Sequence, residues 1–308
     1  MKLATSSGDF VRYTNSIASA VKSFQGTKFK YINLELDHFC DEMKMTPDQA
    51  VKVLKEAAEQ AGITYSTAHA PILNAFDGDE THYRHCVQIT RDSIEIAGKL
   101  GISGTVIHAC HMPTWTAGEF YQKNKEFYSE FFDLMEKYNI TVMTENTAKH
   151  TEIFLSTGKE LKEFADFVDH PLFGVCWDIA HANLNERARV KDQYDHIFDI
   201  GDKLKGLHIA DNFGDGAHHH TFPFAGIINF DSVIQALLDV NYDGFFTFEA
   251  SYTLLHHTNL PYHRQSWEHN GQTVTRLWDP PIELKREAVD LLYDIGAYLL
   301  KSYDCYEE

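Results

Sequence analysis

Short apolar segments alternate with longer amphipathic segments along most of this chain, and this alternation constrains its fold more than any other feature. Each apolar segment has the length of a β-strand and is rich in Val, Ile, Phe, Tyr or Thr. The eight segments are 3–5, 31–37, 63–69, 104–108, 140–145, 174–178, 204–209 and 245–249. Strands that alternate with helices pair in parallel through right-handed crossovers. The pattern therefore predicts an α/β fold.

Helix-like segments fill the intervals between the predicted strands. The segment 47–61 begins with Thr46-Pro47, a proline suited to the first helical turn, and ends before Gly62. Gly62 and Gly101 each precede an isoleucine, which is typical of a glycine C-cap that leads the chain toward a strand. The other predicted helices are 81–100, 117–138, 157–168, 190–201, 230–240 and 282–300.

Eight strand–helix units favour closure into a (β/α)8 barrel. The chain has 308 residues, and such a barrel needs ~250 residues plus insertions. The competing architecture is an open doubly wound sheet, which usually carries a GxGxxG motif after its first strand, and this sequence has none. No linker or low-complexity segment divides the chain. We therefore expect a single-domain TIM barrel over residues 1–308.

Composition argues against several classes of function. The net charge of −18 opposes nucleic-acid binding, because that binding draws most of its affinity from Lys and Arg that neutralise phosphates. No apolar run approaches the ~20 residues that a membrane span needs. The first ten residues lack the basic and apolar regions of a signal peptide. The five cysteines are widely spaced and form no CxxC, which favours reduced thiols in a cytoplasmic protein over a cysteine-built zinc site.

Six consecutive predicted strands end in, or next to, an ionisable residue, and the C-terminal ends of barrel strands are where active sites gather. These residues are His69, His108, Glu145, Asp178, His208 and Glu249. One glutamate at a strand end is usually a cap or a surface group, but buried carboxylates that converge need a compensating cation. We expect Glu145, Asp178, His208 and Glu249 to hold one divalent metal ion, with no organic cofactor. Mixed nitrogen and oxygen ligands suit Mn²⁺, Zn²⁺, Co²⁺ or Fe²⁺ better than Ca²⁺.

Four stretches of the sequence resemble the xylose-isomerase-like barrel superfamily. They are 145–147 (ENT), 177–183 (WDIAHAN), 208–212 (HIADN) and 220–230 (HTFPFAGIINF). The likeness covers nearly the whole chain through about Glu249. The last stretch is similar to the family's H-x-x-P-G-x-G-x-I-D-F segment, but Phe224 stands where the first glycine usually is. The superfamily includes isomerases and epimerases of sugars and sugar phosphates, inosose dehydratases and apurinic-site nucleases of the endonuclease IV type.

By this resemblance, Glu145, Asp178, His208 and Glu249 match the four metal ligands of the epimerases. In those enzymes the metal chelates a carbonyl and its neighbouring hydroxyl and stabilises an enediolate, while the two glutamates act as base and acid. The resemblance implies that Glu145 and Glu249 are catalytic and that His181 hydrogen-bonds a substrate oxygen. Ketohexose epimerases also place an arginine soon after the strand-seven histidine, and 211–214 reads DNFG. Ketohexose 3-epimerisation as such is therefore disfavoured, while the broader class stands.

Endonuclease IV binds three zinc ions through nine ligands, and eight positions of this chain correspond to them: His69, His108, Glu145, Asp178, His181, His208, His220 and Glu249. The ninth, an aspartate, is His218 here. A second or third metal is thus an alternative. His69 and His108 are interpreted either as substrate ligands or as hydrogen-bonded wall residues, and His220 as a contact to substrate or metal.

Residues 251–280 form a long connection before a final helix at 281–300. Long loops without regular structure are usually functional or disordered, and the aromatic content of this one argues against disorder. We expect a lid on the catalytic face, with Arg264 or Arg276 as a candidate ligand of a substrate anion or hydroxyl. The alternative for this segment is an oligomer contact.

The sequence thus predicts a metal-dependent sugar isomerase or epimerase that acts on a small carbohydrate. An inosose-type dehydratase is the nearest variant, because the same proton removal serves both reactions. Two further hypotheses are an abasic-site nuclease and a catalytically idle barrel that binds a sugar or a partner. Neither a nucleic acid nor a membrane is an expected partner, and assembly into a homo-oligomer stays open.

Overall fold

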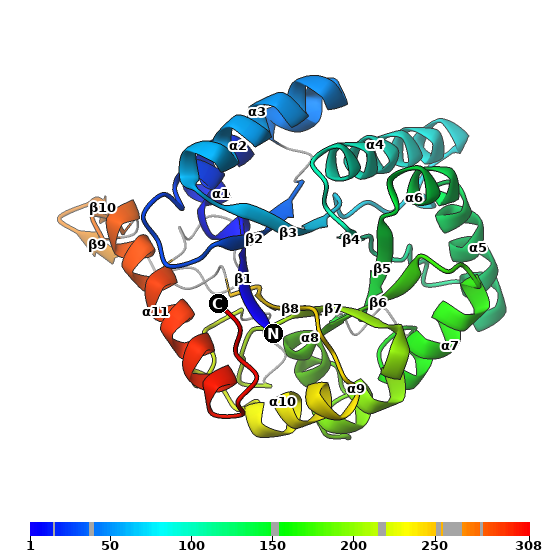
Figure 1. Cartoon of the computed structure of the whole chain (residues 1–308). Coiled ribbons are helices and arrows are strands. Elements are labelled where there is room, and N and C mark those ends of the chain that lie inside the picture. The colour runs from blue at the N-terminus through cyan, green and yellow to red at the C-terminus, as the bar shows by residue number, and fades with distance from the viewer. Residues whose placement is uncertain are drawn as a thin grey trace.

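Eight parallel strands form one sheet in which seven strands follow one another in chain order, as the computed structural model shows (Figure 1). The structure describes residues 1–14, 16–36, 40–148, 154–214, 220–250, 254, 267–277 and 280–308. The strands are β1 (Lys2–Ser6), β2 (Tyr31–Glu35), β3 (Thr64–His69), β4 (Gly104–Val106), β5 (Thr141–Glu145), β6 (Phe173–Asp178), β7 (Leu204–His208) and β8 (Phe245–Phe248).

Strand pairing closes the sheet on itself. Its order is β7-β6-β5-β4-β3-β2-β1-β8, so that β7 and β8 stand at its two ends. Ile209 joins these ends: its N–H donates to the Thr247 carbonyl at 2.8 Å, and its own carbonyl accepts from Glu249 N at 3.0 Å. The predicted (β/α)8 barrel is confirmed, and the C-terminal ends of all eight strands meet at one mouth.

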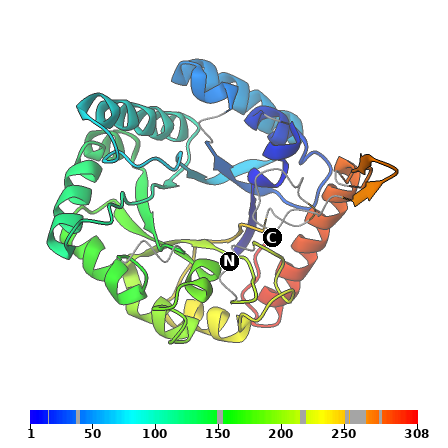
Figure 2. The same ribbon diagram turned by 180° about the vertical axis from the view of Figure 1, so that it is seen from behind.

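The helices surround the barrel, as Figures 1 and 2 show from opposite ends. They are α1 (Gly8–Thr14), α2 (Ile17–Lys22), α3 (Pro47–Ala61), α4 (Glu80–Lys99), α5 (Ala117–Ser129), α6 (Phe132–Tyr138), α7 (Gly158–Val168), α8 (Ile179–Leu184), α9 (Gln193–Ile200), α10 (Phe230–Asp239) and α11 (Ile282–Lys301). Thr46, Thr116 and Thr157 begin α3, α5 and α7 with capping boxes, in which the threonine hydroxyl and the side chain three residues later satisfy free N–H groups.

One helix prediction was wrong. The segment 117–138 is not a single helix but two, because the chain turns at Glu130, whose N–H bonds to the carbonyls of Phe127 and Tyr128. This turn places Phe131 in the core, where its ring packs edge-on against Phe127 at 5.0 Å between centroids. The short helices α1, α2 and α8 are absent from the sequence-based expectation.

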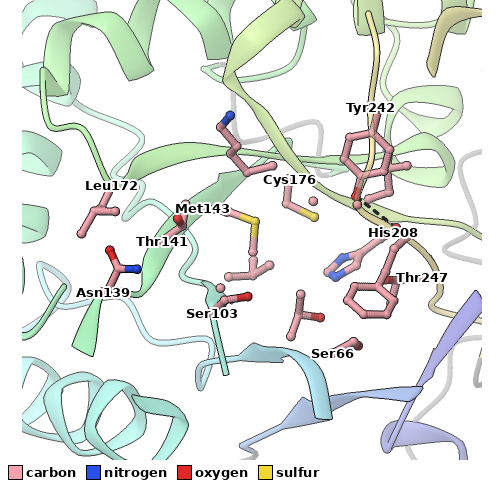
Figure 3. Close-up of a pocket in the computed structure, with 18 residues that line it drawn as sticks. Ser66, Ser103, Asn139, Thr141, Met143, Leu172, Cys176, His208, Tyr242 and Thr247 are labelled. Atoms are coloured by element: carbon pink, nitrogen blue, oxygen red, sulfur yellow. Dashed lines mark hydrogen bonds between the residues drawn. The ribbon is translucent and has the colours of Figure 1, made fainter. Parts of the chain in front are cut away.

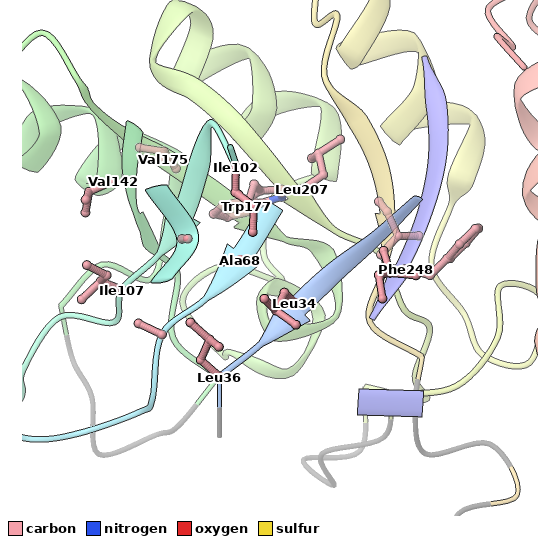
Figure 4. Packing of buried hydrophobic residues seen from close by; sticks show 14 of the residues in the cluster. Leu34, Leu36, Ala68, Ile102, Ile107, Val142, Val175, Trp177, Leu207 and Phe248 are labelled. Atoms are coloured by element: carbon pink, nitrogen blue, oxygen red, sulfur yellow. The ribbon is translucent and has the colours of Figure 1, made fainter. Parts of the chain in front are cut away.

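Apolar side chains fill the layer between the strands and the helices (Figure 4). Successive strand residues face opposite sides, so at several strand ends an outward apolar residue precedes an inward polar one. Leu34 precedes Glu35, Trp177 precedes Asp178, and Phe248 precedes Glu249 in this way. Burying one such side chain stabilises the fold by roughly 1.5–3 kcal/mol, so the same packing that holds the barrel together also aims the polar residues into its mouth.

The connection between β8 and α11 is only partly described. Within the predicted lid 251–280, the structure describes Leu254, residues 267–277 and Pro280. Residues 267–277 contain an exposed hairpin of β9 (Trp267–His269) and β10 (Gln272–Val274), which lies beside α11 in Figure 1. Arg276 is exposed after this hairpin, whereas Arg264 lies outside the described residues. None of the described helices is long and apolar enough to cross a membrane.

Candidate metal centre

Four buried or half-buried side chains from consecutive strands converge at the barrel mouth. Glu145 ends β5, Asp178 ends β6, His208 ends β7, and Glu249 directly follows β8. Asp178 and His208 are register partners, which brings them to the same level of the barrel. One nitrogen or carboxylate oxygen from each of the four residues lies within 4.8 Å of the others. This is the set that the strand ends predict.

His208 lies between the two glutamates. Its Nδ1 is 3.0 Å from Glu145 Oε1 and 3.2 Å from Glu249 Oε2. The Glu145 side chain is only 1% exposed, whereas that of Glu249 is 22% exposed and faces the mouth. Without a cation, the imidazole is thus the nearest positive partner for both carboxylates.

Hydrogen bonds hold Asp178 in place but leave one of its carboxylate oxygens without a partner among the described residues. Its N–H donates to Asn146 Oδ1 at 2.7 Å, and Asn146 Nδ2 donates to its carbonyl at 2.8 Å. Its Oδ1 accepts from His181 N at 2.7 Å and thereby caps α8. Its Oδ2 is buried without a hydrogen-bond partner among the described residues. An unsatisfied buried acceptor costs about 1–3 kcal/mol or more when charged, and a cation would remove that cost.

Four more histidines surround this set, as the sequence predicts. His108 Nε2 is 3.2 Å and His69 Nε2 is 3.5 Å from Glu145 Oε2. His181 Nδ1 is 3.4 Å from Glu145 Oε1, and His220 Nδ1 is 3.7 Å from Glu249 Oε2. They complete two further groups with metal-ligand spacing, His69–His108–Glu145 and Asp178–His181–His220.

Backbone carbonyls set the orientation of three of these imidazoles. The Nδ1 atoms of His69, His181 and His220 lie 2.8, 2.9 and 2.7 Å from the carbonyls of Ala70, Asn146 and Glu249. A carbonyl can only accept, so each Nδ1 carries a proton there. In the neutral ring Nε2 is then the unprotonated nitrogen and can only accept a hydrogen bond or bind a cation; that of His69 lies 3.2 Å from His108 Nε2.

Burial and mutual charge shift the pKa values of the cluster in opposite directions. Burial raises the pKa of Asp178 to about 8, and the charges of Glu145 and Glu249 add to this rise. Burial alone would also raise the pKa of Glu249, but the imidazoles of His208 and His220 outweigh it and hold that pKa below its usual value. Burial would lower the pKa of His208, yet its neighbours Cys176, Glu145 and Glu249 raise it well above its usual value. Displaced pKa values in a cleft are typical of functional sites.

Residues 26–270 match the family model of the xylose isomerase-like TIM barrel. The chain belongs to this family. The match covers most of the chain, and it confirms the resemblance seen in the strand-end motifs. Active sites of TIM-barrel enzymes lie at the C-terminal ends of the strands, and the metal-ligand cluster lies at that end here.

Relatives of the chain include sugar epimerases. A ketose 3-epimerase of Arthrobacter globiformis is 26% identical over 118 residues, 38% of this chain and 37% of that enzyme. An uncharacterized protein of Methanocaldococcus jannaschii is 26% identical over 215 residues, 68% of this chain and 72% of that protein. A D-tagatose 3-epimerase-like protein has a TM-score of 0.71 at 20% identity, over 98% of this chain and 100% of that chain. A D-psicose 3-epimerase has a TM-score of 0.72 at 16% identity, over 97% and 99%. At these identities the two structures establish the fold alone.

A cavity of about 300 Å³ lies inside the barrel beneath the cluster (Figure 3). His208 borders it at one end, and Ser103, Asn139 and Tyr242 border it near the N-terminal ends of the strands. Barrel interiors in this architecture are usually filled with layered side chains. Here the apolar cluster inside the barrel consists of Val106, Met143 and Cys176, and a glycine stands at position 206. The metal-ligand cluster therefore lies above a hollow lined in part by these residues.

One residue of the mouth was missed by the sequence analysis. Glu35 ends β2 and is the register partner of His69, so it too faces the mouth. The rule that strand ends carry the site residues applies to Glu35 as well, but the predicted strand extended to Asp37, two residues beyond the observed end. His111 is half-buried and packs on Phe120, with 5.0 Å between ring centroids. His218, which stands in place of the ninth ligand of endonuclease IV, lies outside the described residues.

Proposed function

We propose that this chain is a divalent-metal-dependent enzyme that isomerises or epimerises a sugar or sugar derivative. The observation that carries the proposal is the set Glu145, Asp178, His208 and Glu249, whose ligand atoms lie within 4.8 Å of one another on four consecutive strand ends. The chain belongs to a family whose relatives include sugar 3-epimerases. That context favours sugar chemistry over other uses of a metal.

The residues present fit a cation. Two glutamates, an aspartate and an imidazole form a donor set suited to Mn²⁺, Zn²⁺, Co²⁺ or Fe²⁺. The unpartnered Oδ2 of Asp178 supports this assignment, because the described residues offer it no hydrogen bond. When bound, such a cation polarises a carbonyl oxygen and makes the neighbouring C–H more acidic.

Glu145 and Glu249 are the proposed acid and base. They come from β5 and the end of β8, on either side of Asp178 and His208, so their carboxylates approach a substrate in the mouth from two sides. One carboxylate removes a proton from the carbon beside the carbonyl, and the other donates or returns one. Glu249 is the more exposed of the two and faces the incoming substrate.

The surrounding histidines are the proposed substrate contacts. Because the Nδ1 atoms of His69, His181 and His220 donate to backbone carbonyls, their neutral rings present Nε2 as a hydrogen-bond acceptor for sugar hydroxyls. His108 completes this wall beside His69, with 3.2 Å between the two Nε2 atoms. Arg264 remains a predicted substrate ligand outside the described residues.

Solvent exchange tests this function directly. The Mn²⁺-loaded protein is incubated in D₂O with a panel of ketoses, aldoses and inososes, and deuterium at the carbon beside the carbonyl is measured by mass spectrometry and NMR. We expect exchange into at least one sugar, and its loss in Glu249→Gln. Glu56→Gln on the exposed face of α3 is the matched control. Normal exchange in Glu249→Gln would refute the acid–base pair, and no exchange with any compound would refute the function. Water loss from an inosose would identify the dehydratase variant.

An abasic-site nuclease is a second candidate, favoured by one observation. The groups His69–His108–Glu145 and Asp178–His181–His220 share Glu145 and Asp178 with the first set, as a site for several metals would require. The net charge of −18 opposes it. One metal ion per chain, measured by elemental analysis, supports sugar chemistry. Three zinc ions together with cleavage of an abasic oligonucleotide would support the nuclease instead.

A further inference from the structure

Glu35 lies across the barrel mouth from Asp178, one of the candidate metal ligands. In the closed order of eight strands, β2 is four strands from β6 in either direction, so the end of β2 faces the end of β6. Asp178 ends β6, and Glu35 ends β2. A sugar held at the cation through its carbonyl end can therefore bring a more distant hydroxyl within reach of Glu35.

Contacts with Ser6, Ser7 and Gly8 fix the position of the Glu35 side chain. Ser6 Oγ donates to Glu35 Oε1 and itself accepts from Gly8 N at 2.9 Å. The Glu35 N–H donates to Ser7 Oγ at 2.9 Å. A Cβ at Gly8 would come within 2.6 Å of both carboxylate oxygens, so the glycine makes room for the carboxylate. A side chain this well placed loses little further conformational entropy when it binds a partner.

One oxygen of this carboxylate makes no hydrogen bond with the described part of the protein. Ser6 is the one hydrogen-bond partner of the Glu35 carboxylate among the described residues, and Oε2 has none there. Glu35 is half-buried, and its Oε2 is not among the buried side-chain atoms that lack a hydrogen-bond partner, so this oxygen stays accessible at the mouth. Burial and the charge of Glu249 raise the pKa of Glu35, while Ser6, His69 and His208 act against this rise. Glu35 thus feels the charges of the metal-ligand cluster, although it belongs to none of its ligand groups.

We propose that Glu35 binds a substrate hydroxyl remote from the reacting carbon and thereby selects which sugars the site accepts. This inference rests on the proposed function. The carboxylate accepts the hydroxyl hydrogen through Oε2, while Ser6 keeps Oε1 in place. Glu35 acts on binding and orientation, and the proton transfer stays with Glu145 and Glu249.

The test compares three forms of the Mn²⁺-loaded protein: wild type, Glu35→Gln and Gly8→Ala. Glu35→Gln keeps the shape of the side chain and removes its charge. Gly8→Ala keeps the Glu35 carboxylate but displaces it, because the added Cβ occupies the space beside it. Gly8 has no positive φ, so alanine is compatible with its backbone. Glu56→Gln is again the matched control. Each variant is assayed for metal content, for KM and kcat of solvent exchange on the best sugar, and for the same constants on deoxy analogues that lack one remote hydroxyl each.

We expect both variants to keep one metal ion per chain and to lose about 10- to 100-fold in kcat/KM, mostly through KM, as for a lost hydrogen bond to a charged group. On one deoxy analogue, wild type and Glu35→Gln should perform equally, because the contact is already missing. A merely structural role would lower activity on every analogue alike.

Each outcome has a distinct meaning. If wild type exchanges no sugar, the proposed function fails and this inference falls with it. If wild type exchanges a sugar and Glu35→Gln matches it, the inference alone is overturned. Loss of metal from either variant, or an equal penalty on all deoxy analogues, overturns it as well, because Glu35 would then support the cation site or the fold instead of the substrate.

Discussion

Replacing Lys285 by methionine should destabilise the protein by about 3–5 kcal/mol, the usual cost of leaving one partner of a buried ion pair alone. Lys285 of α11 places its Nζ 2.9 Å from Asp9 Oδ1, and the two side chains are 0% and 1% exposed. Thr5 Oγ1 donates to the other carboxylate oxygen at 2.7 Å. Methionine fills a similar volume but leaves the Asp9 carboxylate buried without its cation.

The loss is measured by urea unfolding of the metal-free protein, so that metal affinity does not enter the comparison. Lys162→Met is the control, since Lys162 and Asp166 form an exposed pair worth at most about 1 kcal/mol. The double variant Asp9→Asn/Lys285→Met should recover much of the loss, because no charge is left buried. A Lys285→Met variant that loses no more than Lys162→Met would refute the reasoning.

Two further predictions concern the metal ligands and the packing. Cation affinity should rise between about pH 6 and 8, because protons bound to the ligands compete with the metal. His208 is the main competitor: burial alone would lower its pKa, but Cys176, Glu145 and Glu249 raise that pKa well above its usual value. By the same sign, the metal-free protein gains stability from charged His208 below the unfolded-state pKa and loses it as pH rises through the raised value. Co²⁺ titrations at pH 6, 7 and 8 check the predicted rise in cation affinity, and equal affinities at the three pH values would contradict it. Gly158→Ala should lower Tm far more than Gly206→Ala, because its Cβ would collide with the His196 carbonyl oxygen, whereas the Cβ at position 206 would meet the movable Met143 Sδ at 2.7 Å, beside a cavity. Equal changes in Tm, measured by calorimetry, would show that the cavity does not absorb the shift.

Most of the fold could be predicted from the strand pattern in the sequence. Buried parallel strands are short apolar runs, and such runs located both ends of all eight strands to within two residues. The helix α3 has the predicted bounds, Pro47–Ala61, because Pro47 and the left-handed Gly62 mark its ends in the sequence itself. Predicting the barrel then required only the number of strand–helix units and no knowledge of contacts between distant residues.

Other features depend on contacts that no local pattern contains. The turn at Glu130 is favoured by the burial of Phe131 in the finished core, and 117–138 reads locally as one helix. The short helix α8 exists because Asp178 caps it while also facing the site. The roles of Glu35 and Gly8 emerge only when β1 and β2 are paired, which places the carboxylate over the glycine. The hollow beneath His208 likewise follows from which side chains meet inside the closed barrel.

Diffraction from a crystal loaded with Co²⁺ tests the central claim most directly. Anomalous scattering at the metal edge would place the ion without reference to activity. We predict a peak at about 2.0–2.2 Å, the range of Zn–N and Zn–O bonds, from His208 and from the carboxylates of Glu145, Asp178 and Glu249. A peak bonded to other residues, or a loaded crystal with no peak at the barrel mouth, would contradict the proposed metal site.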